Sequence, residues 1–454
     1  MLRNIGIRTL VVIGLPTDQC IDHTVKDAVD RGDRVGCPPD ACQAETSGRH
    51  SDALECFQGY CEQVSVTALD AAMLAPMGGG WSVSLLRELL AGRWKLLLAL
   101  SALAIVVPPS AASNLKLPYF LLCGLALIPL AQITAELVDR LVHRVGERLG
   151  GLLNVTLGNM LELVIALTAL RSGLYELVVV SIAGAVITNS LLVLGISTML
   201  AGRRTLLVDL NHHSRGLSTR QLLISVILMS VPSIFFWDSM YPIKEGGEVM
   251  DLFAVYSLIV AVVVMASYLL SYIYQLGTHR HLFLAMNNRN EADAAATSET
   301  PMHSIALALV LVALAIAGVS QHLVEGLEEL VMGSGFTPLF VGMLLLPLFS
   351  AIPEALVAFR AANQGRMGLA MASTVESSVQ LMLFVLPMLV LLAPLMGRYL
   401  HLTFPPPALA CLGATAFAVH WVTEGDELTW YQGLLLLSTY IALFTGSLFL
   451  KPMM

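Results

Sequence analysis

The chain has 454 residues, of which 56% are hydrophobic and only 13% are charged, about half the charged fraction of an average soluble protein. Its mean hydropathy of +0.75 is too high for a single membrane anchor, because one spanning helix needs only about 20 apolar residues. The net charge of −8 leaves no basic surface for nucleic acid. The composition therefore predicts an integral, multi-pass membrane protein, excludes an ordinary soluble globule and makes nucleic acid an unexpected partner.

The first 72 residues differ from the rest because they are polar and carry five of the seven cysteines. The odd cysteine total argues against a disulfide framework and favours a reducing, cytoplasmic location. The pattern predicts strand Arg8–Leu15, helix Thr17–Arg31, strand Arg34–Asp40 and helix His50–Val64. We therefore expect a short α/β fragment.

This fragment carries a motif of its own. The segment from Gly14 to Ala28, followed by Asp40 and His50, resembles the C-terminal third of isochorismatase-like cysteine hydrolases. The resemblance implies that Cys20 matches the nucleophile of that family, at a helix N-terminus that favours the thiolate. The upstream strands that supply the family's partner Asp and Lys have no counterpart in the 19 residues before Cys20. We expect an inactive fragment, followed by a linker over 73–93, and keep a membrane-tethered cysteine hydrolase as the alternative of another class.

From Trp94 onward, apolar runs of membrane-spanning length recur along the chain. They predict eleven transmembrane helices, over 94–110, 117–137, 149–170, 174–200, 219–237, 250–275, 302–323, 336–362, 367–392, 405–423 and 429–449. One set of alternate loops holds eleven Lys and Arg residues and the opposite set holds five. The positive-inside rule places the first set and the N-terminus in the cytoplasm. We expect the inner or plasma membrane as the location.

A repeat with a fixed offset of 192 residues divides the helical part in two. Gly158 to Glu162 falls on Ser350 to Glu354, and Gly173 falls on Gly365. Five helices separate equivalent positions, and because this number is odd the two halves enter the membrane in opposite senses. The sequence therefore predicts an all-α fold with about eleven transmembrane helices and two inverted five-helix repeats, as in secondary transporters. The predicted division is a first transmembrane helix at 94–110, a first repeat at 117–275, a cytoplasmic loop at 276–301 and a second repeat at 302–449.

Each repeat carries one carboxylate at the same place, Glu162 in the first and Glu354 in the second. A carboxylate in the membrane is costly and is kept where it pairs, coordinates an ion or relays protons. Asn159 is three residues before Glu162, so one helix face would present a carbonyl oxygen beside a carboxylate. Hard cations such as calcium prefer ligand sets made of oxygen. The alternative is a protonated structural glutamate that hydrogen bonds across helices.

Neighbouring helices add small and polar residues at i, i+3, i+4 and i+7 spacing. They are Ser181, Gly184, Ala185 and Thr188 in the first half, and Ser373, Glu376, Ser377 and Gln380 in the second. Ordinary helix packing is the alternative for the small ones. Asn189 adds a carbonyl next to Thr188, although it could also bond a neighbouring helix. Glu376 replaces Gly184 of the first half, and we expect a third carboxylate at the site that acts as a ligand or proton carrier.

Two prolines interrupt the backbone hydrogen bonds around Glu354. Pro353 removes the N–H that would bond the carbonyl of Phe349, and Pro347 does the same for Met343. A freed carbonyl inside the membrane needs a partner, which an ion could supply. A kink chosen for packing is the alternative.

Four segments together resemble the two α-repeats of calcium/proton exchangers: Gly150 to Leu167, Ser181 to Gly195, Phe340 to Glu354 and Ser377 to Pro387. The resemblance covers about 94–449 and implies the fold of the Ca:cation antiporter superfamily. It also implies that Glu162 and Glu354 bind cation and proton in turn, with Asn159, Asn189, Ser377 and Gln380 nearby. Ala351, Ala355 and Glu376 depart from the family pattern and leave the preferred cation open.

The predicted function is cation/proton antiport that exports calcium from the cytoplasm. Two carboxylates held close together in a low-dielectric site repel one another unless a cation or protons neutralise them. Cation and protons therefore compete for one site, and the proton gradient drives cation movement. The alternative within the same fold is exchange of sodium, potassium or another divalent cation. No permanently bound cofactor is expected, and the sequence predicts no oligomeric state.

Overall fold

The structure is a computed structural model with two compact units, Met1–Trp81 and Ser82–Met454. It describes residues 9–13, 21–30, 34–56, 61, 63, 65, 95–107, 116–145, 153–154, 156–203, 208–209, 212–240, 247–275, 302–334, 337–425 and 427–448. Cys20, the predicted linker at 73–93 and the predicted loop at 276–301 lie outside these residues. Each unit is described by itself.

The N-terminal unit has the expected order of strand, helix, strand and helix. Strand β1 (Thr9–Val11) pairs in parallel with β2 (Arg34–Gly36), and α1 (Asp22–Asp30) connects them along the chain. Helix α2 (Ser47–Cys56) follows. The small core of this unit includes Val25, Val35 and Cys37.

Two predicted boundaries in this unit were wrong. The strand expected to reach Asp40 ends at Gly36, and Pro39–Ala41 forms a 3-10 turn, η3. Proline has no N–H to donate to a neighbouring strand, so the pair Pro38-Pro39 ends the ladder. The last helix begins at Ser47 rather than His50, and the described helix ends at Cys56 rather than Val64.

The first half of the helical unit consists of α5 (Lys95–Val106), α6 (Lys116–Val145), α8 (Met160–Arg171), α9 (Tyr175–Ile187), η5 (Thr188–Val193), α10 (Leu194–Gly202), β3 (Val208–Asp209), α11 (His212–Met240) and α12 (Gly247–Ile273). The second half consists of α13 (Met302–Ser334), α14 (Pro338–Phe340), η10 (Val341–Leu345), α15 (Leu346–Ser350), α16 (Ile352–Asn363), α17 (Met367–Met371), η11 (Ala372–Glu376), α18 (Ser377–Gln380), η12 (Leu381–Val385), α19 (Leu386–Leu392), η13 (Ala393–Met396), α20 (Pro406–Val422), β4 (Glu427–Leu428) and α21 (Trp430–Leu448). The segments η5, η10, η11 and η12 are π-helical. Strands β3 and β4 pair antiparallel.

Within the described part of the chain, six helices are long and apolar enough to cross a membrane. They lie within Leu117–Val142, Tyr175–Gly202, Leu217–Phe236, Leu252–Ile273, Met302–Leu327 and Met367–Met396. A seventh would be the pair Val341–Ser350 and Ile352–Asn363, which is bent by 56°. Apolar composition thus makes this unit an all-helical integral membrane domain.

Element boundaries recur at the 192-residue interval seen in the sequence. Helix α8 runs from Met160 to Arg171, and α16 runs from Ile352 to Asn363. Gly173 and Gly365 follow with φ of 81° and 72°, which favour glycine. The π-helical segments η5 and η12 also occupy corresponding places. The two halves therefore share their local structure as well as their sequence pattern.

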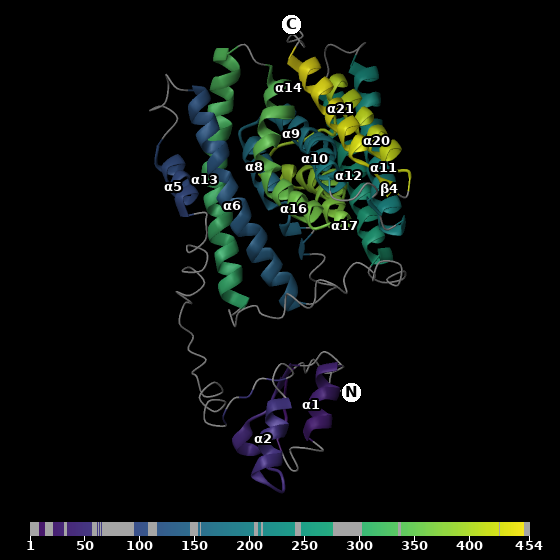
Figure 1. Cartoon of the computed structure of the whole chain (residues 1–454). Coiled ribbons are helices and arrows are strands. Elements are labelled where there is room, and N and C mark those ends of the chain that lie inside the picture. The colour runs from purple at the N-terminus through teal and green to yellow at the C-terminus, as the bar shows by residue number, and fades with distance from the viewer. Residues whose placement is uncertain are drawn as a thin grey trace. The chain divides into compact units, whose positions relative to one another are not determined.

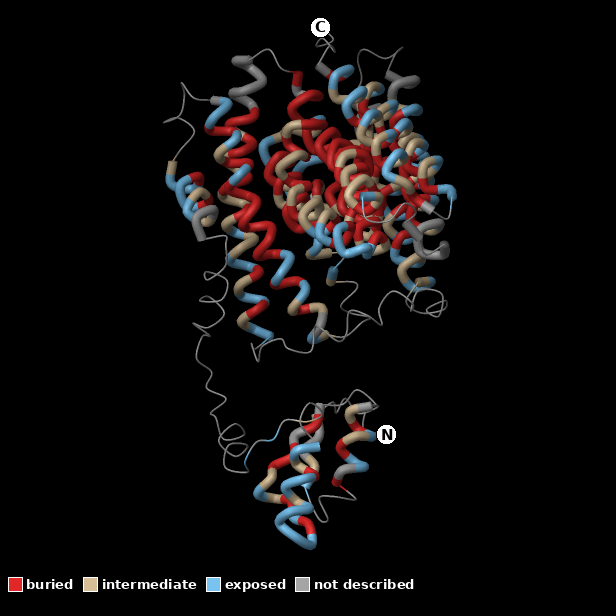
Figure 2. The backbone as a smooth tube through the Cα atoms, in the orientation of Figure 1, coloured by how far each residue is buried: buried red, intermediate tan, exposed pale blue. Residues whose placement is uncertain are grey.

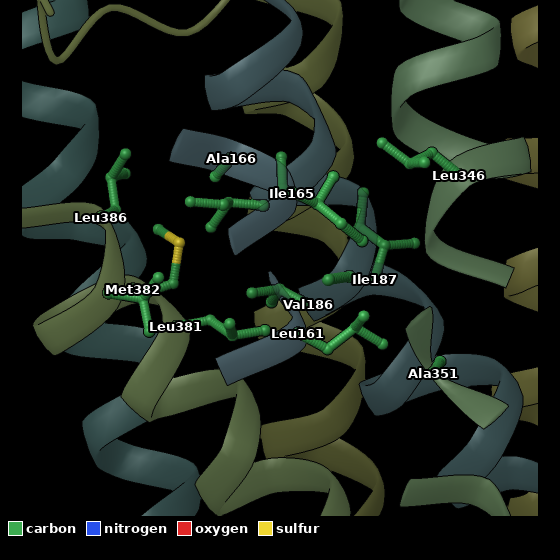
Figure 3. Packing of buried hydrophobic residues seen from close by; sticks show 14 of the residues in the cluster. Leu161, Ile165, Ala166, Val186, Ile187, Leu346, Ala351, Leu381, Met382 and Leu386 are labelled. Carbon is green, nitrogen blue, oxygen red and sulfur yellow. The ribbon is translucent and has the colours of Figure 1, made fainter. Parts of the chain in front are cut away.

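The core of the helical unit lies along the middle of the bundle (Figure 1). In the span Tyr175–Gly202, 89% of the most apolar window is buried, against 22% in Met302–Leu327, and Figure 2 shows buried positions concentrated in the central helices. Figure 3 shows that the core cluster draws Ile165 from α8, Val186 from α9 and Met382 from η12. Both halves therefore contribute to one apolar core, in which any polar side chain is shielded from lipid and water.

Candidate ion-binding site

Both predicted carboxylates lie in the first turn of a helix that begins after a break inside the bundle. A turn at Gly158 and Asn159 precedes α8, and Glu162 is the third residue of that helix. A turn at Ala351 precedes α16, and Glu354 is its third residue. The free N–H groups of a helix start carry partial positive charge, so each break places a favourable dipole beside a carboxylate.

These breaks correct two predictions. The helix expected over 149–170 is not continuous, because Asn159 caps α8 with φ of −102° and ψ of 29°. Asn159 and Glu162 therefore do not share the face of one uninterrupted helix. Pro353 is the second residue of α16, where a missing N–H leaves no helical bond unmade. Its role is to start a new helix after the bend.

The two carboxylates lie close enough to interact electrostatically. Glu162 is only 6% exposed. In each glutamate, Oε2 is buried and has no hydrogen-bond partner. Two neighbouring buried carboxylates without partners need protons or a cation to neutralise them.

A small cavity borders Glu162, with room for the centre of about one water molecule (≈ 10 Å³). Helices α8, α9 and α15 line it with Glu162, Ile165, Ser181, Ile182, Ala185, Leu346, Pro347 and Ser350. On α9, the carbonyl of Met343 lies so close to Gly184 that a Cβ there would overlap it. This is the carbonyl that Pro347 was predicted to free, and it packs against the backbone of the opposite half.

Asn159 joins the two halves through its side chain. The Ser377 hydroxyl donates to Oδ1 of Asn159 at 3.1 Å, and Nδ2 of Asn159 donates to Oε1 of Gln380 at 2.7 Å. Beside them, the hydroxyls of Ser190 and Ser378 hydrogen bond at 3.0 Å. Three residues that the sequence analysis singled out thus meet in one hydrogen-bonded group, although more than 200 residues separate Asn159 from the other two.

Thr188 and Asn189 are each 1% exposed, at the start of π-helix η5. Oγ1 of Thr188 and Oδ1 of Asn189 are buried without hydrogen-bond partners. Four of the eight predicted residues, the two glutamates and this pair, therefore carry an unpartnered buried oxygen. Such atoms are costly unless a ligand satisfies them.

Glu376 lies in different surroundings from those predicted. The Ser218 hydroxyl of α11 donates to its Oε1 at 3.0 Å, and Tyr268 and Tyr272 of α12 are its charged-state neighbours. Its structural contacts thus lead to α11 and α12. The π-helical turn η11 ends at Glu376 and interrupts the i, i+3, i+4 spacing that predicted a shared face with Ser377 and Gln380.

Sequence reasoning missed two residues, Tyr268 and Tyr440. The Tyr440 hydroxyl on α21 lies beside Thr188, and the Tyr268 hydroxyl on α12 lies beside Gln380. Each tyrosine stands in an otherwise apolar helix, where membrane proteins use tyrosine for many purposes. No local pattern marks either one.

Comparison with known proteins identifies the family. The model of the sodium/calcium exchanger protein family matches residues 115–277 and 304–449, more than half of the chain. The chain belongs to the sodium/calcium exchanger family. The resemblance read from the α-repeats is thereby confirmed, and this exchanger is a transport protein. The isochorismatase domain model matches residues 1–68, which confirms the second resemblance for a short fragment.

Relatives of this exchanger cover most of its helical unit. It is 30% identical to a Ca²⁺/H⁺ antiporter of Synechocystis sp. over 73% of this chain and 91% of the relative. It is also 30% identical to vacuolar cation/proton exchanger 1a of Oryza sativa subsp. japonica, over 80% and 82%. The structure of native YfkE matches with a TM-score of 0.64 and 22% identity, over 79% of this chain and 99% of that chain. That structural likeness shows a common fold.

Proposed function

We propose that this exchanger moves calcium out of the cytoplasm in exchange for protons. The observation that carries the proposal is the pair of interacting, buried glutamates at the starts of two equivalent helices, each with an unpartnered oxygen. The names of the relatives as Ca²⁺/H⁺ antiporter and cation/proton exchanger support the same exchange.

The proposed cation ligands are Glu162, Glu354, Thr188 and Asn189. Their carboxylate, hydroxyl and amide oxygens form the hard ligand set that calcium prefers. Among the described residues, no group of three His, Cys, Asp or Glu side chains forms a metal centre, so neutral oxygens must complete the coordination. Asn159 supports the site through Ser377 and Gln380, which stay candidate ligands. Glu376 contributes charge nearby through α11 and α12.

Coupling follows from the carboxylate pair. When a cation leaves, Glu162 and Glu354 repel one another and take up protons, and when a cation returns the protons are released. One site therefore holds either cargo but not both. A proton gradient across the membrane then drives cation movement when access alternates between the two sides.

The proposed architecture is two inverted five-helix repeats among eleven spans, with the N-terminus in the cytoplasm. The matching boundaries of α8 and α16 and the matching π-helical segments support a repeat. An odd number of helices between equivalents makes it inverted, and alternating access then occurs by movement of one repeat against the other. A reporter fused after Met454 should read as extracytoplasmic, and a cytoplasmic signal contradicts this topology.

The function is tested in proteoliposomes that contain an internal pH dye. Calcium, sodium, potassium, magnesium and manganese are added in parallel, and proton release is followed for each. The proposal expects calcium-dependent collapse of an imposed proton gradient. Collapse by another cation but not by calcium assigns a different cargo, and no cation-dependent collapse overturns the proposed antiport.

A further inference from the structure

Two buried tyrosines hold equivalent positions next to the proposed site. Tyr440 is 5% exposed on α21, the last helix of the second half, and its hydroxyl lies beside Thr188 of the first half. Neither hydroxyl oxygen has a hydrogen-bond partner. Two buried hydroxyls that are adjacent but unbonded are a reserve of polar interaction.

Tyr268 forms the counterpart. It is 5% exposed on α12, the last described helix of the first half, and its hydroxyl lies beside Gln380 of the second half. Thr188 and Gln380 are equivalent, because they are 192 residues apart. In each half, therefore, the final helix sends a tyrosine to the same place in the other half.

The chemistry of the two partners explains what a phenol oxygen does there. A threonine hydroxyl binds a cation through a lone pair, so its hydrogen must point away from the ion and needs an acceptor. Tyr440 supplies that acceptor for Thr188. Gln380 already uses its carbonyl oxygen to accept from Asn159 at 2.7 Å, so its NH₂ group needs an acceptor, and Tyr268 supplies one.

We propose that Tyr268 and Tyr440 are positioning residues that orient Gln380 and Thr188 toward the transported cation. The inference rests on the proposed function. Outer partners of this kind fix the direction of a ligand and tune its affinity for a metal ion. The two tyrosines also couple the last helix of each half to the site in the other, so that movement of a half changes ligand orientation.

The test uses substitutions that remove only the hydroxyl. The ring of Tyr440 packs against Phe444 with centroids 6.4 Å apart, and that of Tyr268 against Phe384 at 6.3 Å, so phenylalanine retains the packing. In Tyr440→Phe and Tyr268→Phe we expect the calcium concentration for half-maximal exchange to rise about tenfold or more, as for other outer-shell changes. The maximal rate should change far less.

Matched controls come from the same helices. Tyr431→Phe on α21 removes an exposed hydroxyl, and Tyr256→Phe on α12 removes one that is remote from the proposed site. Both controls should transport like the wild type. Equal melting temperatures and equal membrane levels for all variants separate loss of orientation from loss of folding.

A double-mutant cycle identifies the partner. In a Thr188→Val background the hydroxyl that Tyr440 orients is gone, so adding Tyr440→Phe should change the half-maximal concentration no further. Multiplying effects, or wild-type values for both tyrosine variants, overturn the inference. Either result appears in a protein whose wild type exchanges normally, whereas failure of the proposed function appears as a wild type that does not exchange.

Discussion

Gly184→Ala should disturb the contact between the two halves next to the carboxylate site. A Cβ at this position of α9 would overlap the carbonyl oxygen of Met343 and lie 2.6 Å from its carbonyl carbon and 2.7 Å from its Cα. The obstacle is backbone rather than the end of a flexible side chain. Helix α9 and segment η10 must therefore separate.

The size of the effect follows from these distances. Carbon atoms in contact lie about 3.5–4.0 Å apart, so the backbones must move by about 1 Å. Overpacking of this kind costs about 1–3 kcal/mol, and the better helix propensity of alanine offsets up to about 1 kcal/mol. The same movement displaces Ser181 and Ala185, which line the cavity beside Glu162.

The assay pairs a melting temperature in detergent with calcium-dependent proton release in proteoliposomes. Gly413→Ala on α20 is the matched control, because a Cβ there meets nothing within 4 Å and alanine should stabilise the helix. Gly184→Ala should melt below both the control and the wild type and should have an apparent calcium affinity lower by about tenfold. A Gly184→Ala protein that melts and transports like Gly413→Ala would refute the close contact.

Three further predictions concern regions around this core. Glu376→Gln and Glu376→Gly should retain exchange but shift its pH profile or ion preference, because Glu376 contacts Ser218 rather than the carboxylate pair; profiles that superimpose on the wild type would contradict a role. Deletion of residues 1–72 should leave exchange intact, since these residues belong to a separate compact unit; loss of exchange in a truncated protein that still reaches the membrane would show the opposite. Burial and the neighbouring Cys42 thiol raise the pKa of Cys37 to about 12, so this thiol stays protonated at pH 8 and should be alkylated more slowly than exposed Cys56, with a rate that rises with pH; equal rates in peptide mapping would count against it.

The hydropathy pattern predicts most helix positions in the membrane unit. The run predicted over 174–200 becomes the continuous span Tyr175–Gly202, and the run over 405–423 becomes α20 at Pro406–Val422. Burial of apolar side chains determines both, and this term is visible residue by residue in a sequence. The internal offset of 192 residues was equally visible.

The breaks inside these runs were harder to predict. The segment around Gly158 and Asn159 is as apolar as a continuous helix, and the hydrogen bonds that end it are made in three dimensions. Pro347 and Pro353 signalled a disturbance near Glu354 but not the 56° bend after Ser350. Hydropathy measures where side chains prefer to be, whereas a break depends on which backbone groups find partners.

The candidate site could be predicted in part. Glu162, Glu354 and Asn159 stand out because polar groups are rare in an apolar run. Glu376 was placed with the wrong neighbours because π-helical turns have no sequence period that a helical pattern reveals. Tyr440 was missed because its partner Thr188 lies about 250 residues away along the chain, and only the fold brings them together.

The most direct test of the central claim is exchange by Glu162→Gln and Glu354→Gln, measured separately in proteoliposomes as calcium-driven proton release. Glutamine keeps the shape of each side chain but cannot ionise, so neither variant can hold a divalent cation and protons in turn. Both proteins should insert into the membrane and melt like the wild type, and both should lose calcium-driven proton release. Wild-type rates in either variant would contradict exchange at a pair of carboxylates.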